Sequence, residues 1–399
     1  MSQAPNEPRL PGTAADGPRP SDTAAGSVPA AGSVPAQRRS RRDAPGPRRV
    51  PAPRAPERTV LGYHLPVFTA LVVIGVLCLL GLGTLAVQFG GVVRVFFAEA
   101  ALGLVFAAVT LLFGFWLFRR IRPVRAPDLA ASLVAVLWGL TAATGGALLA
   151  NSALTGIWSK SLGLEFSAAW GAALTAPFNE ELFKLAGIVL VAVAFPRALR
   201  GPIDGFIVGA LVGLGFEVTE NLIYGLNAVV GAGGVNGGEA VVQSTFVRVL
   251  LTGLGSHWAM SAVAGAGVGL LAAAGWLPGG RRLLGALALV LTAMGMHWLF
   301  DSPLLEGFAG IVVKVLLNFA IAMAVYSTAR HVHRRRVRRA LAQEGEDVGL
   351  RRSAAVALAR RRARHRALHE VPEAERAEAR RVQALMVDAA EDRAFTHAD

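Results

Sequence analysis

The chain is poor in cysteine and in lysine, and each shortage is informative. Only one of its 399 residues is cysteine, Cys78, so an internal disulfide and a cysteine-ligated metal centre are both excluded. Its basic residues are almost all arginine, and the only lysines are Lys160, Lys184 and Lys314. That bias, together with abundant alanine and glycine, is typical of GC-rich bacterial coding. A lysine inside an apolar segment, such as Lys184, therefore stands out.

Charged residues of either sign are also scarce for a chain of this length. They make up 17% of the residues, against 53% that are hydrophobic, and the mean hydropathy is +0.48. This composition excludes a soluble domain and indicates an integral membrane protein. The net charge of +13 lies mostly at the two ends, so we expect basic tails that meet anionic lipid headgroups and no nucleic-acid partner.

The sequence divides into three regions of different composition. Residues 1–58 are rich in Pro, Ala, Gly, Ser and Arg and cannot bury a core, so they are predicted to be a disordered basic tail. Residues 59–330 are predicted to form the membrane domain. Residues 331–399 are charged and favour helix, which predicts a basic, helical cytoplasmic tail. We expect this tail to lie partly on the membrane surface or to bind a partner; a solvated tail without a specific role is the alternative.

Apolar runs predict an all-α polytopic membrane protein with about eight transmembrane helices. The runs are long enough to span a bilayer at 65–88, 95–118, 129–150, 168–195, 203–229, 245–275, 283–302 and 308–328. Every second connecting segment carries arginine: 119–127, 196–202 and 277–282. The positive-inside rule then places these segments and both termini in the cytoplasm. With the bacterial coding bias, the expected location of the protein is the inner membrane of a bacterial cell.

Ionisable and amide groups inside the predicted spans are few, and they cluster in spans four to seven. The clustered set is Glu180, Glu181, Lys184, Glu217, Glu220, Asn221, Arg248, His257, His297 and Asp301. At about 1.5 Å per helical residue, Glu181, Glu220, His257 and His297 lie roughly 21 to 27 Å from the cytoplasmic ends of their spans. Four helices therefore bring polar groups to one layer. Because charge within a bilayer is costly, this layer is the predicted functional site.

The spacing of these groups along each helix predicts which of them interact. Glu180 and Lys184 are four residues apart and are expected to pair, which leaves Glu181 free on another face. His297 and Asp301 are also four apart, so the aspartate can ligate the same ion or orient the imidazole. Glycines at 205, 209 and 213 allow a close helix contact below the carboxylates.

Such a set of side chains suits the activation of water. Two imidazoles and one or more carboxylates can bind Zn²⁺ with a position open for water, and a further glutamate can act as general base. A metal-free mechanism is equally open, in which a buried glutamate deprotonates water while histidines and Asn221 stabilise the oxyanion.

Three ordered motifs resemble those of a known family. EELFK at 180–184 fits an EExxK motif, FEVTEN at 216–221 fits FxxxEN and HWLFD at 297–301 fits HxxxD, with His257 in the intervening span. Together they are similar to the PrsW family of intramembrane metalloproteases, in the wider group of CAAX prenyl proteases and bacteriocin-processing membrane proteins. The resemblance covers residues of about 60 to 330.

The resemblance implies an intramembrane endopeptidase that hydrolyses a peptide bond in a single-span membrane protein, for example an anti-sigma factor. At the matching positions the expected catalytic residues are Glu180, Glu181, Lys184 and Glu220, with Glu180 or Glu181 as the general base. Glu181 is preferred because Glu180 has a lysine four residues on. The matching positions also give His257, His297, Asp301 and Glu220 as metal ligands, with zinc the expected metal.

Two other classes of function stay open at this stage. A proton- or ion-coupled transporter also uses buried carboxylates and histidines, although the polar residues here show no second copy in the other half of the chain. A non-catalytic membrane scaffold or sensor would act through its tail. The motifs HExxH, GxSG and GxGD of other intramembrane protease classes do not occur in the sequence.

Overall fold

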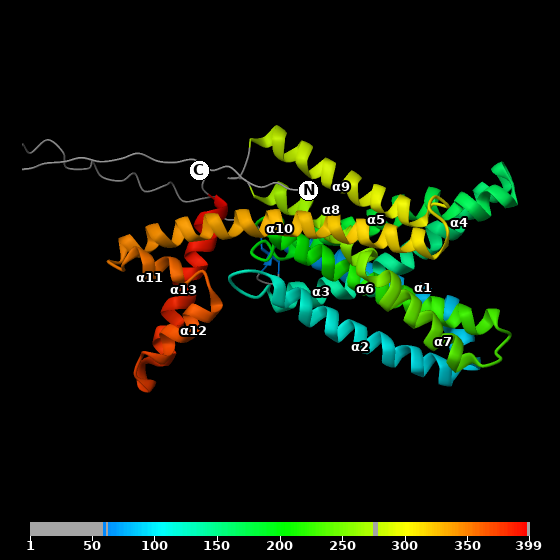
Figure 1. Ribbon diagram of the computed structural model, residues 1–399, viewed down its shortest axis with the longest axis horizontal. Helices are drawn as coiled ribbons and strands as arrows, with labels where there is room; N and C mark the ends of the chain where they lie inside the picture. The colour runs from blue at the N-terminus through cyan, green and yellow to red at the C-terminus, as the bar shows by residue number, and fades with distance from the viewer. Residues whose placement is uncertain (1–58, 61–62, 274–277, 397–399) are drawn as a thin grey trace, which may run out of the picture. The chain divides into compact units, whose positions relative to one another are not determined.

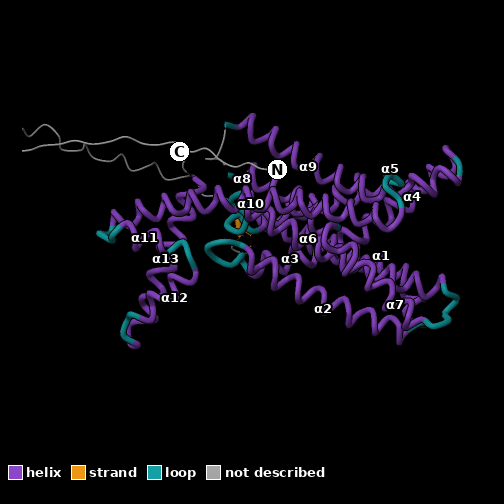
Figure 2. Tube along the Cα trace, viewed as in Figure 1, coloured by secondary structure: helices purple, strands orange, loops and turns teal. Residues whose placement is uncertain are grey.

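Helices make up nearly all of the described chain. The computed structural model describes residues 59–60, 63–273 and 278–396 (Figure 1). The N-terminal tail predicted to be disordered, 1–58, lies outside the described residues. Helices dominate the trace in Figure 2, and the only strands among the described residues are β1 (Thr59–Val60) and β2 (Tyr63–His64), which pair antiparallel. The predicted all-α class is confirmed.

The apolar region folds into a bundle of long helices. Its elements are α1 (Leu65–Val95), α2 (Phe97–Ile121), α3 (Leu129–Trp138), α4 (Thr144–Leu162), α5 (Leu164–Ala194), α6 (Pro202–Gly231), α7 (Gly237–Thr245), α8 (His257–Ala272), α9 (Gly279–Asp301) and α10 (Gly307–Asp347). Within the described residues, seven helical stretches are long and apolar enough to cross a membrane, which supports a multi-pass protein. α5 has 31 residues but is less uniformly apolar, because it carries Glu180, Glu181 and Lys184.

Two spans differ from the sequence prediction in length and regularity. A π-helical turn, η1 (Gly139–Ala143), joins α3 to α4, and the helix continues to Leu162 before the chain turns at Gly163. In the predicted sixth span, helix begins early, at Gly237. It then passes through the π-helical turn η2 (Phe246–Thr252) and the short 3₁₀ turn η3 (Gly253–Gly255). A fresh helix, α8, starts at His257, and π turns of this kind often mark functional sites.

Helix α6 lies at the centre of the bundle and is buried along most of its length. Its glycine stripe faces α8 closely. A Cβ atom at Gly209 would lie 2.0 Å from the carbonyl oxygen of Ser261, and one at Gly213 would lie 2.5 Å from that of His257. Only glycine permits so close an approach of two helix backbones. The stripe therefore brings the start of α8, and His257 with it, against α6.

The C-terminal tail folds back on helix α10. The tail elements are α11 (Arg352–Ala357), α12 (Arg361–His369) and α13 (Arg376–Thr396). Apolar residues of α13, including Val387 and Ala390, pack with Val337 and Leu341 of α10 and with Val124 of the α2–α3 connection. Helix α13 thus shares one small core with α10 and a loop of the bundle.

One buried carboxylate ties this tail to two loops. Glu391 contacts Arg122 at 3.1 Å, Arg125 at 2.6 Å and Arg200 at 2.8 Å. Burial acts to raise the pKa of Glu391, but His333, 3.4 Å away, and the guanidinium charges outweigh it, so this pKa lies well below its usual range. Glu391 is therefore ionised in the folded protein and links the α2–α3 and α5–α6 connections to α13.

Candidate active site

Four helices bring the seven predicted site residues into one cluster. Helix α5 supplies the EELFK stretch, α6 supplies Glu220, α8 begins with His257, and α9 ends with His297 and Asp301. The imidazole rings of His257 and His297 meet edge to face, with centroids 5.1 Å apart. The layer expected from the depth of each residue in its span is thus a cluster of side chains in direct contact.

A carboxylate and two imidazoles form the centre of the cluster. Oε2 of Glu180 lies 3.7 Å from Nδ1 of His257 and 3.7 Å from Nε2 of His297. The three residues are buried, and one ligand atom from each lies within 4.8 Å of the other two. Two ligand atoms about 2.1 Å from a tetrahedral Zn²⁺ ion lie roughly 3.4 Å apart. The two separations of 3.7 Å from Glu180 to the imidazole nitrogens are close to that value.

The other nitrogen of each imidazole faces a second carboxylate. Nδ1 of His297 lies 3.0 Å from Oε1 of Glu181, and Nε2 of His257 lies 2.6 Å from Oε2 of Glu220. A carboxylate accepts a hydrogen, so each of these nitrogens donates its proton outward. The opposite nitrogens, Nδ1 of His257 and Nε2 of His297, are the ones that lie near Oε2 of Glu180. Carboxylates that hold metal-binding histidines in this way are the usual outer partners of a metal site.

Lys184 pairs with both adjacent glutamates. Its Nζ lies 3.3 Å from Oε2 of Glu180, 3.0 Å from Oε1 of Glu181 and 2.9 Å from Nδ1 of His257. The expected pair of Lys184 with Glu180 is present, but the expectation that Glu181 is left free is wrong, because the ammonium also reaches the residue at i−3. Phe216 covers the ammonium, with its ring centroid 3.9 Å away. The donor atoms of Glu180 and His257 therefore already face a cation.

Arg248 holds the outer side of Glu220. Its Nη2 donates to Oε2 of Glu220 at 2.5 Å, and its Nε donates to Oδ1 of Asn221 at 2.6 Å. The guanidinium also stacks over Tyr224, 3.9 Å from the ring centroid. Since Arg248 lies in the π-helical turn η2, this irregular turn places a cation beside Glu220. Glu220 is thus fixed between Arg248 and His257.

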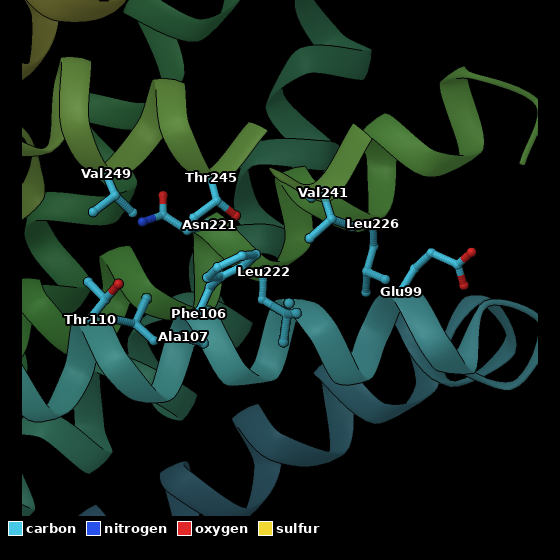
Figure 3. A pocket seen from close by; sticks show the side chains of 13 residues that line it. Glu99, Phe106, Ala107, Thr110, Asn221, Leu222, Leu226, Val241, Thr245 and Val249 are labelled. Carbon is cyan, nitrogen blue, oxygen red and sulfur yellow. The ribbon is translucent and has the colours of Figure 1, made fainter. Parts of the chain in front are cut away.

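The amide group of Asn221 faces a separate small cavity. Figure 3 shows Asn221 with Thr110 and Thr245 among the side chains that line it, between α2, α6 and α7. The cavity holds about 10 Å³, roughly the space of one water molecule. Nδ2 of Asn221 is buried and has no protein partner within the described chain. None of the clustered carboxylates and imidazoles lines this cavity, so it does not belong to the central cluster.

Two asparagines that the sequence did not single out also belong to the site. Asn151 donates from Nδ2 to Oε1 of Glu180 at 2.9 Å, and Asn179 donates to Oδ1 of Asn151 at 3.2 Å. Asn151 lies just beyond the predicted span, which ends at residue 150, whereas the helix continues to Leu162. The sequence signal that could have identified it is a single amide side chain directly after the apolar run. The two amides orient Glu180.

A cavity of about 490 Å³ opens at the cluster. Glu180, Glu220, His257, His297 and Asp301 line it, together with hydroxyl groups of α4 and α5 such as those of Thr155, Ser167 and Thr175. Glu181 and Lys184 lie behind this wall, with Glu181 only 2% exposed. Of the two adjacent glutamates, Glu180 is the one that faces the cavity.

The donor set fits a divalent metal ion. Two imidazoles and one carboxylate are a common catalytic zinc set, and outer carboxylates hold both rings here. The sequence groups Glu220 and Asp301 with the two histidines, whereas the structure groups Glu180 with them. Glu220 occupies the outward nitrogen of His257. Oδ2 of Asp301 lies 3.4 Å from Nε2 of His297, at the edge of the same centre.

Comparison with known proteins agrees with the site. The family described as "PrsW family intramembrane metalloprotease" matches residues 128–327, half of the chain. The matched segment contains all seven predicted site residues as well as Asn151 and Arg248. No curated protein and no solved structure matches the chain. With the family match, the Glu/His/His cluster and the membrane-spanning helices in place, the chain belongs to the PrsW family of intramembrane metalloproteases.

Proposed function

We propose that the protein cuts a peptide bond of a membrane-associated protein in the cavity beside Glu180, His257 and His297. One observation carries the proposal: atoms of these three residues converge within 4.8 Å at the wall of a cavity of about 490 Å³. A buried carboxylate and two oriented imidazoles that face such a space suit the hydrolysis of a bound chain.

Glu180, His257 and His297 would hold the metal ion, with zinc the ion best suited to this donor set. When bound, the ion would supply a Lewis acid that lowers the pKa of water and polarises a peptide carbonyl. Glu181 and Glu220 keep the two rings in the required tautomers through Nδ1 of His297 and Nε2 of His257. Asn151 holds Glu180 through the other carboxylate oxygen.

Asp301 is the proposed proton acceptor. Its side chain is 20% exposed, lines the cavity, and has one oxygen 3.4 Å from Nε2 of His297. Glu220, in contrast, already pairs with Arg248 and His257, and Glu181 is buried and does not line the cavity. Asp301 is therefore the cavity carboxylate best placed to take a proton from water at the centre and pass it to the leaving amine.

A metal-free variant of the same hydrolysis is the second candidate. The ammonium of Lys184 lies 2.9 Å from Nδ1 of His257 and 3.3 Å from Oε2 of Glu180, among the atoms that would bind the ion. In that variant the lysine supplies the positive charge, and Glu180 is the base. Chelation separates the two candidates, because it abolishes cleavage in the first and leaves it unchanged in the second.

The substrate that we propose is a single-span membrane protein such as an anti-sigma factor, as the family suggests. Arginine in alternate connecting segments supports an inner-membrane protein of bacteria with both termini in the cytoplasm. The basic tails would then face the anionic lipid headgroups of the cytoplasmic leaflet.

The proposed activity can be tested without knowing the substrate. New protein N-termini are mapped by mass spectrometry in membranes of cells that express the wild type, Glu180→Gln or His297→Ala at equal levels. We expect cleavage products next to or inside single transmembrane segments with the wild type only. Identical N-termini in all three strains would contradict a protease and favour a transporter or a scaffold.

A further inference from the structure

Helix α10 contacts the backbone beside both histidines. The candidate ligands lie on α5, α8 and α9, yet two polar residues of α10, Lys314 and Asn318, are one turn apart and buried. Both face the segments that carry His257 and His297. Polar groups at such a depth are costly unless they make hydrogen bonds, so their contacts call for an explanation.

Asn318 joins the two histidine segments through one amide. Its Nδ2 donates to the carbonyl oxygen of Gly255 at 3.1 Å and to that of Met296 at 3.3 Å. Gly255 stands two residues before His257, and Met296 stands directly before His297. An NH₂ group has two hydrogens, and each is directed to one of these carbonyls. The side chain is wholly buried and does not line the cavity.

The backbone at Gly255 needs such an external partner. The chain leaves the π-helical turn η2, passes through the three residues of η3 and begins a new helix at His257. A carbonyl in this break lies outside the regular α-helical ladder. Gly255 also packs directly on α10, since a Cβ atom there would lie 2.2 Å from the carbonyl oxygen of Val315. The start of α8, and with it the direction of the His257 side chain, is therefore set against α10.

Lys314 holds the other segment at its end. Its Nζ donates to the carbonyl oxygen of Ser302 at 2.6 Å and to that of Phe300 at 3.4 Å. These carbonyls lie at the C-terminus of α9, where a cation is favoured by the helix dipole. They flank Asp301 in sequence. Lys314 thus fixes the last turn of α9, which presents both His297 and Asp301.

We propose that the Lys314–Asn318 face of α10 is a positioning element for the candidate metal centre. It sets the separation and orientation of His257 and His297 from behind, through the backbone. The inference rests on the proposed function, because it assigns the face a task only if the two imidazoles act together. Neither residue touches the reacting atoms. A leucine at 318 has the same branching at Cγ but no N–H group, so the amide is present for its two donors.

Binding of Co²⁺ alone tests this inference, because its visible absorption reports the number and geometry of its ligands. Metal-depleted, detergent-purified wild type is titrated beside Asn318→Leu and Asn318→Asp, with Ser261→Ala as the matched control. Ser261 is fully buried in α8 and its hydroxyl has no partner in the described chain. Thermal unfolding of the metal-free proteins reports packing separately.

We expect Asn318→Leu to bind Co²⁺ about 10-fold or more weakly and with an altered absorption band, as for other outer-shell changes. Its unfolding temperature should fall below that of Ser261→Ala, because the carbonyls of Gly255 and Met296 lose a buried donor, so Co²⁺ binding is compared at a temperature where both variants are folded. If neither Asn318 variant folds, Lys314→Met, which loses only the contacts at the end of α9, should still weaken Co²⁺ binding several-fold.

Opposite outcomes separate this inference from the proposed function. If Asn318→Leu binds Co²⁺ with the affinity and absorption of the wild type, the positioning role alone is overturned. If neither Asn318 variant folds, the same result for Lys314→Met overturns it. The metal centre would remain supported if His257→Ala/His297→Ala had lost Co²⁺ in the same titration. Equal Co²⁺ binding by wild type and that double variant would overturn the metal centre and the positioning role together.

Discussion

Glu181 accepts a hydrogen bond from Nδ1 of His297 at 3.0 Å, across the packed interface of α5 and α9. The bond uses one oxygen of the carboxylate and fixes the tautomer of the ring. It turns the second nitrogen of His297 toward Glu180. Glu181 thereby acts on the centre through a histidine, whereas Glu180 faces the cavity itself.

Removing charge from each adjacent glutamate should have unequal effects. We expect Glu180→Gln to lose metal and to reduce kcat/KM on the order of 10³-fold or more, because it removes a ligand. Glu181→Gln can still accept from His297 and should cost about 10- to 100-fold. Metal analysis and cleavage of one common substrate measure both effects. A folded, metal-loaded Glu181→Gln that is as inactive as Glu180→Gln would instead identify Glu181 as the base.

The role of Asp301 predicts a split between metal binding and turnover. Asp301→Asn keeps the volume of the side chain but cannot take a proton, so kcat should fall about 10²- to 10⁴-fold. Metal content and KM should stay close to those of the wild type, since the donor set and most of the cavity wall are unchanged. Loss of metal in Asp301→Asn would show that the aspartate is a ligand, and an unchanged kcat would remove it from catalysis.

Arg248 should matter through Glu220. Arg248→Gln leaves the carboxylate in the bundle without its guanidinium partner, and both side chains are mostly buried, at 21% and 16% exposed. Breaking a fully buried pair costs about 3 to 5 kcal/mol, so a smaller loss of stability is expected for this partly exposed pair. The double variant Arg248→Gln/Glu220→Gln should recover stability but not activity. Additive losses in this cycle, measured by thermal unfolding, would mean that the two side chains are not coupled.

Docking of α13 should depend on pH through Glu391. Its pKa is lowered in the folded state, so the carboxylate contributes stability that is present above its ordinary pKa of 4.5 and is lost as the pH falls toward the lower, folded value. We expect α13 to stay protected from hydrogen exchange from pH 5 to pH 8 and to lose protection progressively below about pH 4.5. Exchange measured by mass spectrometry gives the profile.

A matched variant isolates that carboxylate. Glu391→Gln keeps the shape of the side chain but removes its charge from beside Arg122, Arg125 and Arg200. Its α13 should exchange faster than that of the wild type at pH 7 and should show a weaker dependence on pH. Equal protection in both proteins across the whole range would mean that apolar packing alone holds α13.

The site residues were predictable from sequence because buried charge in an apolar span has few structural explanations. Glu180, Glu181, Lys184, His257 and His297 could therefore be identified without coordinates. Their division of labour could not, since Lys184 reaches both i−3 and i−4 and helical spacing alone does not choose between them. The choice depends on which face of α5 meets α9.

The break before His257 and the contacts of α10 were also beyond the sequence. A π turn leaves no distinct pattern in an apolar run, so residues 245–275 are expected to form one continuous helix. Lys314 and Asn318 are single polar residues, one nearer the edge and one in the middle of a predicted span, and their partners are backbone carbonyls of distant segments. Backbone partners of this kind have no sequence signature.

The central claim is that Glu180, His257 and His297 hold a metal ion that cleavage requires. The most direct measurement is the metal content of detergent-purified wild type beside His257→Ala/His297→Ala, with cleavage assayed before and after chelation. The account predicts about one ion per wild-type chain, little in the double variant, and cleavage that is lost on chelation and restored by zinc. Equal metal in both proteins, or cleavage that survives complete removal of metal, would contradict it.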